Sequence, residues 1–408
     1  MKSLRRLFRY GPGPSSSHTI APYMAGKAFR KGLPGKPDEV VVTYYGSLAR
    51  TGEGHGSVKA AIDGIRDFPC RVELDPITRV PHPLTMDFQA FRNGSLLSKK
   101  TYLSLGGGEL HCDDDESVNE KEVYPFACFS DVLAYMEQHK ITQFRDFCMR
   151  FEAKTMDDYL MHCVLRMFDS IETSLKKTGK IPANDNPTLN VNRSAKAVYE
   201  KALTLPRGGE RRTLLITAYA YAVAEASACG ERVVTAPTCG SSGVLPAVLY
   251  YCHKHEKVPL SKIRDALYAA GMVGNVVKAN ATIAGSVGGC QAEIGTASSM
   301  AAAALCAIHG LSPRQIEYAA EVAMEHFLGL SCDPVDGYVI IPCIERNGIG
   351  AIRALTCYRF AKLIAPIREH KVNFDDVVAA MKMTGDSLSA DYKETAAGGL
   401  AVVLHKKC

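Results

Sequence analysis

The sequence lacks several patterns that would assign it to familiar classes of protein. It has no Lys/Arg-rich run, and its 48 basic and 43 acidic residues leave a net charge of only +5. A small charge without interleaved aromatic and basic residues disfavours a nucleic-acid partner. The first residues, MKSLRRLFRYGPGP, contain no apolar stretch before their glycines and prolines, so we expect no secretory signal peptide.

Long hydrophobic runs are also missing. The most apolar stretch, LLITAYAYAVAEASACG, contains Glu225 and falls short of the roughly 20 apolar residues that cross a bilayer. We therefore expect no membrane partner and a cytoplasmic protein. The chain has 408 residues, 47% of them hydrophobic, which is enough for two or three domains with a substantial core. It contains no internal repeat.

Closely spaced C-x-x-C pairs are absent, although the chain has 14 cysteines. In a large chain without an export signal, most of these should be reduced thiols. Eight lie in apolar helical patterns or lack any local motif, and we expect them to pack as small hydrophobic residues. These eight are Cys70, Cys112, Cys128, Cys148, Cys163, Cys252, Cys306 and Cys357.

Three other cysteines lie among glycines and prolines, and a fourth is the last residue. They are Cys290 in GSVGGCQAEIG, Cys332 in MEHFLGLSCDPVDG, Cys343 in IIPCIERN and Cys408 in HKKC. Thiolates in turn-rich backbone can converge on a metal or a cluster, and a cysteine on a terminal tether can enter such a site from outside. Their spacing alone does not prove a metal site.

The two halves of the chain differ in pattern. Residues 1–155 mix strand-like and helical stretches, and the β-branched and aromatic run at 40–45 ends at Gly46, as a strand should. From residue 156 on, apolar residues recur at three- and four-residue intervals in alanine-rich segments. We predict an α+β multidomain protein, with an α/β domain at 1–155 and an all-α domain at 156–408.

Individual elements follow from the same patterns. Ser312 before Pro313 and Ser261 before Lys262 are predicted helix N-caps, and 177–195 is predicted to be a linker or crossing loop. Strands are expected within 39–49 and 98–108, and helices at 21–33, 129–140, 156–177, 211–228, 243–257, 261–278, 291–308, 312–327 and 348–364.

The segment GPGPSSSHTIAPYMAG is a candidate binding site for a carboxylate or phosphate. Ser15, Ser17, His18 and Thr19 stand just before a predicted helix, where hydroxyls and free backbone N–H groups attract anions. An ordinary helix cap on a surface loop is the alternative.

The segment YGSLARTGEGHGSVKAA places His55 between two glycines, where side-chain packing offers little reason for a histidine. We interpret His55 as a general acid/base or a ligand-binding residue. The run GGG at 106–108 lacks the spacing of a dinucleotide-binding site.

Three segments of the second half add candidates. Thr238 and Gly240 in APTCGSSGVLPAV form a possible anion cradle, and Lys393 lies in the polar loop DYKETAAGGLAV. Lys278 could act as a base or bind a substrate carboxylate, with a surface ion pair as the alternative.

Taken together, these segments strongly resemble the iron–sulfur-dependent L-serine dehydratases, in the form that joins both parts in one chain. The likeness runs nearly from end to end. It includes GPGPSSSHT, YGSLARTGEGHG, APTCGSSGVLPAV, GCQAEIGTASSMAAA, MEHFLGLSCDPV, PCIERN and YKETAAGGLA.

The resemblance implies a substrate-binding α/β domain followed by a helical cluster-binding domain, and a homodimer. It also implies a [4Fe-4S] cluster held by Cys290, Cys332 and Cys343, with L-serine as the small-molecule substrate. In some members a C-terminal cysteine reaches into the active site, and Cys408 matches that feature.

Serine dehydration must remove a weakly acidic Cα proton and expel hydroxide, which a Lewis-acidic metal can assist. We expect His55, then Lys278, as the base, with His18 beside the substrate. Three alternatives stay open: the same chemistry on threonine or cysteine, a pyridoxal phosphate enzyme, and a non-catalytic zinc-binding metabolite sensor.

Overall fold

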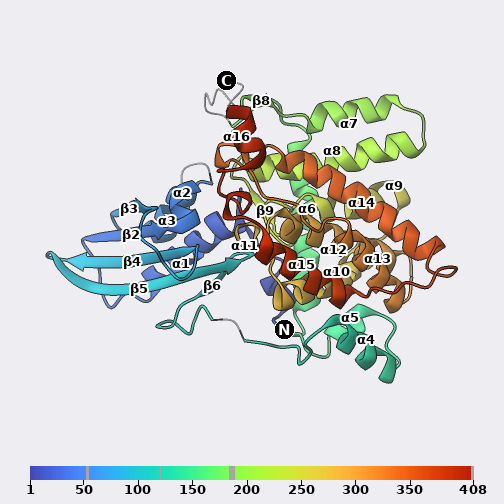
Figure 1. Cartoon of the computed structure of the whole chain (residues 1–408), viewed down its shortest axis with the longest axis horizontal. Coiled ribbons are helices and arrows are strands. Elements are labelled where there is room, and N and C mark those ends of the chain that lie inside the picture. The colour runs from blue at the N-terminus through green and yellow to red at the C-terminus, as the bar shows by residue number, and fades with distance from the viewer. Residues whose placement is uncertain (52–54, 120, 183–188, 406–408) are drawn as a thin grey trace.

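The computed structural model describes residues 1–51, 55–119, 121–182 and 189–405. A sheet with helices against it forms one end of the molecule, and a larger helical body forms the other (Figure 1). Each part has a hydrophobic core of its own. The expected mixture of a strand-containing N-terminal part and a helical C-terminal part is therefore observed.

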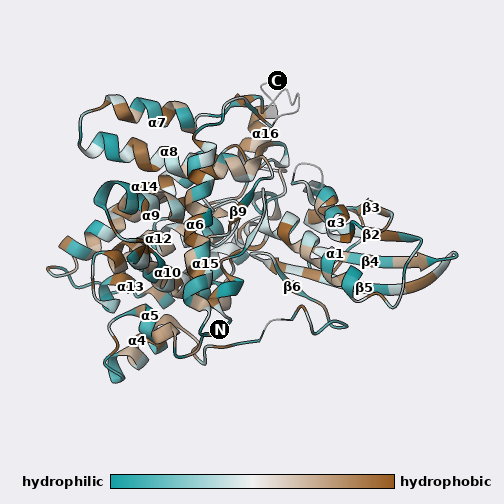
Figure 2. Ribbon diagram, turned by 180° about the vertical axis from the view of Figure 1, so that it is seen from behind, coloured by the Kyte–Doolittle hydropathy of each residue, from teal (hydrophilic) through white to brown (hydrophobic). Residues whose placement is uncertain are grey.

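The sheet has five strands in the order β3-β2-β4-β5-β6, and only the β2–β3 pair is parallel. Val40, Val42 and Tyr44 of β2 are buried on one face together with Phe88 and Tyr102. Hydrophobic and hydrophilic residues alternate through most of β4 (Figure 2), as expected for a sheet buried on one side. The elements are α1 (Ala21–Lys31), β2 (Glu39–Tyr45), α2 (Gly46–Thr51), α3 (Ser57–Ile65), β3 (Cys70–Asp75), β4 (Thr85–Arg92), β5 (Ser95–Gly106) and β6 (Glu109–His111).

The helical body is built around α12, which contacts α9, α10, α13 and α14. Of the 13 residues of α12, only Ala307 is not buried, because its many alanines let neighbouring helices approach on every side. The helices of the body include α6 (Met156–Ser174), α8 (Gly209–Ala228), α9 (Val244–Glu256), α10 (Leu260–Asn280), α12 (Thr296–Ile308), α13 (Pro313–Glu325) and α14 (Cys343–Leu363).

Most of the predicted helices are confirmed, and the differences have local reasons. Ser312 caps α13 through a full capping box with Gln315, as predicted. Ser261 does not cap α10, because that helix already begins at Leu260 after Pro259. The predicted linker at 177–195 contains a short antiparallel pair in its described part. The elements that the patterns did not predict include β7 (Lys180–Ile181), β8 (Val191–Asn192), α7 (Ala195–Thr204), α15 (Phe374–Ser387) and α16 (Gly399–His405), together with β3, β4 and β6 of the sheet.

The N-terminal segment packs with the helical body rather than with the sheet. Leu4, Leu7 and Phe8 are fully buried in the core of that body. Strand β1 (Tyr10–Pro12) then pairs antiparallel with β9 (Arg232–Val234), and the chain continues into α1. Helices α4 (Phe129–Gln138) and α5 (Phe144–Cys148) contribute to the same core. The sheet and its helices therefore occupy only part of residues 1–155.

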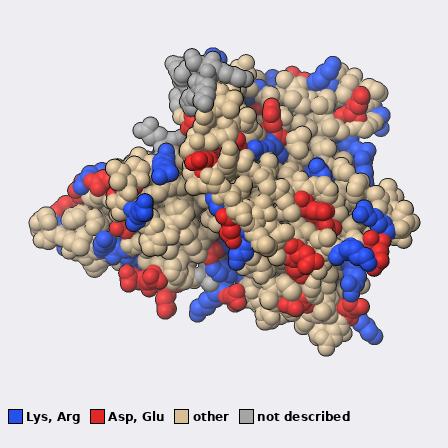
Figure 3. Space-filling view, viewed as in Figure 1, with Lys and Arg blue, Asp and Glu red and all other residues tan. Residues whose placement is uncertain are grey.

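The distribution of charged side chains and the burial of most cysteines expected in the core agree with the predictions from the sequence. Basic and acidic side chains are interspersed on the face shown in Figure 3. Within the described residues, every helix is too short or too polar to cross a bilayer. Six of the eight cysteines expected in the core are buried, whereas Cys70 and Cys128 are only partly buried.

Candidate functional site

Three of the four candidate metal-binding cysteines meet in one place. Cys290 directly precedes a single π-helical turn, η3 (Gln291–Gly295), Cys332 lies in the loop after α13, and Cys343 begins α14. All three are buried. The sulfurs of Cys290 and Cys332 and a carboxylate oxygen of Glu293 lie within 4.8 Å of one another. Cys343 lines the same small hollow as Cys332 and Glu293.

Arg346 fixes the loop that carries Cys332. It is three residues after Cys343 on α14, so both side chains leave the same end of that helix. Its guanidinium donates to the carbonyl of Ser331 at 2.8 Å and pairs with Asp333 at 3.3 Å. Both neighbours of Cys332 in the chain are thereby tied to the helix that begins with Cys343.

Asn347, the next residue of α14, holds a second loop against the site. Its amide group donates to the carbonyls of Gly240 and Cys343, at 2.7 and 2.9 Å, and accepts from the backbone N–H of Gly243 at 2.9 Å. Asn347 is fully buried. It therefore connects a cysteine directly to the predicted anion cradle around Thr238 and Gly240.

The thiols influence one another's protonation. A hydrogen bond from Cys332 lowers the pKa of Cys290 to about 7, against the opposing effect of burial and with the help of the Arg346 guanidinium. The same contact and burial raise the pKa of Cys332. A thiolate on Cys290 is thus accessible near neutral pH, as ligation of a metal requires.

Two histidines and a glutamate form a second cluster beside the cysteines. His18, on the π-helical turn η2 (Ser16–Ile20), stacks on His55 with ring centroids 4.5 Å apart. Glu394 Oε1 lies 3.3 Å from His55 Nε2 and 3.9 Å from His18 Nδ1. Both ring nitrogens of His55 are buried and neither has a hydrogen-bond partner among the described residues, so the 3.3 Å contact of Nε2 with Glu394 is an ion-pair distance.

Neighbouring groups set the charge of this cluster. Burial lowers the pKa of His18 to about 4, so its ring is neutral at physiological pH. Its two nitrogens lie 3.1 Å from the hydroxyls of Ser15 and Ser47. For Glu394, burial favours a higher pKa, but His18 and His55 outweigh it and the pKa is lowered. The cluster therefore consists of one carboxylate that faces two buried imidazole rings.

Glu394 is also joined to the cysteine loop through the backbone. Its N–H donates to the carbonyl of Cys332 at 2.9 Å, and the N–H of Cys332 donates to the carbonyl of Tyr392 at 2.8 Å. Glu394 adopts a positive φ of 59°, a conformation that costs free energy for a residue with a side chain. Glu394, Ser15 and Gly240 line the hollow together with Cys332 and Cys343.

The remaining predicted substrate-binding residues each make their own separate contacts. The hydroxyl of Thr238 donates to Glu293 Oε1 at 2.6 Å, and burial, Glu394 and Cys290 raise the pKa of that carboxyl group. The hydroxyl of Thr19 is within hydrogen-bond distance of the carbonyls of Pro12 and Ser15. Ser17 is buried on η2, and Lys393 pairs with Cys332 in an isolated parallel bridge.

For two predicted site residues, Lys278 and Cys408, no contact with this cluster is described. Lys278 forms an ion pair with Glu109 at 2.5 Å in a different hollow, which Lys2 also lines. Lys278 therefore forms the ion pair that was the alternative to a role as base, but this ion pair is largely buried rather than on the surface. Cys408 lies outside the described residues.

Sequence reasoning did not single out Glu293, Glu394, Arg346 or Asn347 as site residues. Each of them nevertheless lies inside or next to a segment that had drawn attention, namely GCQAEIG, YKETAAGG and PCIERN. For Glu293, Glu394 and Arg346, the signal that could have found them is a charged residue within four positions of a candidate cysteine or glycine turn, whereas the uncharged Asn347 carries no such signal. The two π-helical turns of the site, η2 and η3, carry His18 and Glu293, and turns of this kind are common at functional sites.

The donor set of this site suits a metal cofactor. Thiolates are the ligands that iron–sulfur clusters, zinc and Cu(I) prefer, and three thiols converge here with carboxyl groups nearby. The histidines and Glu394 adjoin the thiols rather than replace them, so acid/base groups and a metal could act on one small molecule.

Comparison with protein families gives two matches that together cover most of the chain. The serine dehydratase beta chain family matches residues 3–80, and the serine dehydratase alpha chain family matches residues 106–401. The order of the two matches is that of the sheet-containing and the helical parts.

Curated proteins are similar over nearly the whole length. The chain is 34% identical to the L-serine dehydratase of Helicobacter pylori, with 100% of this chain and 99% of the relative covered. It is 35% identical to L-serine dehydratase 1 of Escherichia coli, with 98% and 99% covered. It is 36% identical to the L-serine dehydratase of Streptomyces coelicolor, with 97% of each covered.

Proposed function

This chain belongs to the serine dehydratase family, in the form that joins both parts in one chain, and from that premise we propose that it is an L-serine ammonia-lyase. It would convert L-serine to pyruvate and ammonia. The observation that carries the proposal is the convergence of Cys290, Cys332 and Cys343 with a carboxylate–histidine cluster around one hollow.

We propose that these three cysteines hold a [4Fe-4S] cluster. The fit rests on the donor set, because three buried thiols converge and the pKa of Cys290 is already lowered toward the thiolate form. When bound, a cluster with three protein ligands supplies a Lewis-acidic iron that assists departure of the serine hydroxyl. Arg346 and Asn347 would keep the ligands in place through the contacts they make around Cys332 and Cys343.

His55 is the proposed base. If its Nε2–H donates to Glu394, Nδ1 carries the lone pair and is free to take the Cα proton of serine. A carboxylate that orients an imidazole and stabilises its charged form is a recurrent catalytic arrangement. The neutral ring of His18 stacks on His55 and limits its movement.

The electron balance of the elimination is simple. The electrons of the Cα–H bond form the Cα=Cβ bond, the Cβ–O bond breaks, and the hydroxyl group leaves as water after protonation. The enamine product rearranges to an imine, which water hydrolyses to pyruvate and ammonia. We propose that Ser15, Thr238 and Gly240 bind the polar groups of the substrate, because Ser15 and Gly240 line the hollow and Thr238 donates to Glu293, which also lines it.

Several finer features remain proposals. The substrate-binding and cluster-binding roles of the two parts and a homodimer are carried over from the resemblance, whereas the bounds 1–155 and 156–408 come from the change of sequence pattern and a cytoplasmic location from the composition. Cys408 would serve as a further thiolate ligand that serine displaces, which predicts a lag or cooperative activation by serine. Replacing it as Cys408→Ser without any change in serine dependence or oxygen lability would reject that role.

The decisive experiment is anaerobic reconstitution with iron and sulfide, followed by a pyruvate assay with L-serine. L-Threonine and L-cysteine are tested in parallel, because either could be the preferred substrate. Metal analysis of anaerobically purified protein that finds zinc without iron or sulfide would favour a non-catalytic sensor instead. A protein that contains the cluster but turns over none of the three amino acids would refute the proposed reaction.

A further inference from the structure

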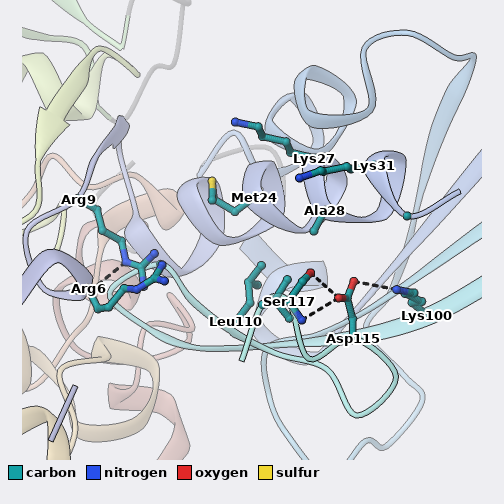
Figure 4. A pocket seen from close by; sticks show the side chains of 13 residues that line it. Arg6, Arg9, Met24, Lys27, Ala28, Lys31, Lys100, Leu110, Asp115 and Ser117 are labelled. Carbon is teal, nitrogen blue, oxygen red and sulfur yellow. Dashed lines mark hydrogen bonds and ion pairs between the residues drawn. The ribbon is translucent and has the colours of Figure 1, made fainter. Parts of the chain in front are cut away.

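Two further hollows of the molecule differ in the donor atoms that line them. One, of about 420 Å³, lies beside α1 (Figure 4), and its described lining contains neither cysteine nor histidine. Its carboxylate, from Asp115, pairs with Lys100 and accepts from Ser117. The other hollow, of about 270 Å³, is lined by residues of α8, α9, α12 and α14, and it holds the donor set of a metal site.

Three potential metal ligands meet in the smaller hollow. Cys252 and Glu256 are four residues apart on α9, so their side chains leave the same face of that helix. His309 directly follows the last residue of α12. The sulfur of Cys252, a carboxylate oxygen of Glu256 and a ring nitrogen of His309 lie within 4.8 Å of one another. The described lining of this hollow shares no residue with that of the hollow of Cys332 and Cys343.

The separations of these atoms are close to those of a zinc site. Zinc ligands lie about 2.0–2.3 Å from the ion, so in a tetrahedral site they are roughly 3.3–3.8 Å from one another. His309 Nε2 is already 3.5 Å from Glu256 Oε2. The ring of Tyr358 on α14 stacks on that of His309, with centroids 4.8 Å apart, and limits the directions in which His309 can point. Small side-chain rotations would therefore close the three groups around an ion.

The protonation and exposure of the three groups allow a cation to bind. Burial lowers the pKa of His309, so its ring is neutral at physiological pH and one nitrogen carries a lone pair. Burial and Glu256 raise the pKa of the Cys252 thiol, and a coordinated cation would displace the thiol proton to solvent. Cys252 is buried, whereas the side chains of Glu256 and His309 are 34% and 29% exposed, so an ion can enter from solvent.

The charge of the ligands offsets the basic residues around them. Arg212, Arg359 and Lys362 line the same hollow, and Lys362 also lies over the ring of Tyr358. These residues oppose an isolated cation. A thiolate and a carboxylate together cancel the charge of a divalent cation, so the occupied site would be neutral.

We propose that Cys252, Glu256 and His309 form a second metal site, which takes zinc or another thiol-binding divalent cation. Cysteine, histidine and carboxylate are all ligands that zinc accepts. Three protein ligands leave a fourth position open to the hollow, for water or a small anion. The bound ion would join the end of α9 to the end of α12, and it would accompany the iron of the proposed cluster rather than replace it.

Anaerobic zinc titration of the reduced, metal-free, full-length protein, against a chromophoric chelator, tests the site. Counting the ions that bind with a Kd below about 1 μM, we expect the wild type to bind one more per chain than His309→Gln. Glu256→Gln should weaken binding of that ion by about 100-fold or more, because loss of a ligand costs more than loss of an outer partner. His326→Gln is the matched control, because His326 also follows a helix and lies 3.7 Å from a glutamate, and it should bind zinc as the wild type does.

Cobalt(II) in place of zinc reports on the sulfur ligand. Part of the sulfur-to-cobalt absorption of the wild type should be lost in Cys252→Ser and fully retained in Cys163→Ser, which removes a buried thiol of α6. All other thiols are the same in these proteins, so their contribution cancels in the comparison.

Either of two results would overturn the proposal. Equal zinc binding by the wild type and His309→Gln would leave only an ion pair between Glu256 and His309. A cobalt spectrum that Cys252→Ser does not change would exclude the sulfur as a ligand. Both measurements use metal-free protein and require no turnover of L-serine, so their outcome is independent of the proposed dehydratase reaction.

Discussion

At the scale of single residues, the charge of one carboxylate governs the histidine pair. Glu394 reaches His55 and His18 from a backbone held by Cys332, so we expect a change of its side chain to affect the orientation of the proposed base, His55, and to leave the three cysteine sulfurs in place. Its positive φ shows that the surrounding structure imposes this placement.

Glu394→Gln should therefore reduce kcat by about 100-fold or more, because the neutral amide no longer stabilises a protonated His55. Since the two side chains act as a unit, adding the change to His55→Asn should cost little more. Steady-state kinetics of the reconstituted enzymes measure this. Asp391→Asn, at a nearby exposed position, serves as control and should keep wild-type activity. Independent, multiplicative losses would contradict the coupling.

The buried neutral ring of His18 predicts a pH dependence of stability. Its pKa is about 4 in the folded protein and about 6.5 when unfolded, so between these values the unfolded chain binds the additional proton. Stability should fall as the pH falls from 6.5 to 4, by about 3 kcal/mol from this residue. Urea unfolding across this range, in the same metal state, should show a smaller decrease for His18→Asn. Identical slopes would refute the assignment.

The cysteines and histidines could be predicted at this scale, but their partners could not. Glycine- and proline-rich surroundings identified Cys290, Cys332 and Cys343, and flanking glycines identified His55. Whether a given charged side chain faces them depends on helix packing. Lys278 shows this, because its position on α10 directs it toward Glu109.

At the scale of elements, α14 organises the site through its first two turns. Asn347→Ala would leave the N–H of Gly243 and the carbonyl of Gly240 without partners in a buried place. We expect it to lower the free energy of unfolding by about 1–3 kcal/mol and to weaken iron uptake. Thr356→Ala, exposed on the same helix, is the control and should be nearly neutral in urea unfolding and iron analysis. Wild-type stability of the Asn347 variant would contradict its role.

The two predicted caps provide a matched pair of variants. Ser312→Ala removes the capping box of α13 and should cost about 1 kcal/mol. Ser261→Ala should cost much less, since α10 begins before that serine. Equal losses in thermal or urea unfolding would contradict the difference. The comparison shows why the existence of a helix was easier to predict than its ends. The apolar pattern predicted α10, but the helix begins at Leu260 after Pro259, before the predicted cap Ser261.

At the scale of the whole molecule, the change of pattern along the chain indicated the observed order of a strand-containing part followed by a helical part, although α4 and α5, before residue 156, already belong to the helical core. It could not indicate that the first residues rejoin the helical core. Leu4, Leu7 and Phe8 have the spacing of a helix, and nothing in their sequence names the distant α10 against which Phe8 packs. Long-range partners of this kind emerge only from the fold.

A fragment of residues 156–408 should therefore not fold cooperatively by itself. It would lack Leu4 and Phe8, the β1 partner of β9, and the aromatic cluster around Phe147. Circular dichroism during thermal unfolding should show a broad, shallow change for the fragment and a sharp transition for the full chain. A sharp transition of the fragment near the temperature of the full chain would contradict this expectation.

The contacts of Arg346 with both neighbours of Cys332 have a consequence for what would follow if oxygen destroyed the proposed cluster. The loop of Cys332 is held to α14 by the bonds from the Arg346 guanidinium to the carbonyl of Ser331 and the carboxylate of Asp333, and neither bond involves a metal. If the three cysteines hold the proposed cluster, its loss in air would leave the loop of Cys332 attached to α14, and reassembly would need new iron and sulfide but no refolding of the chain.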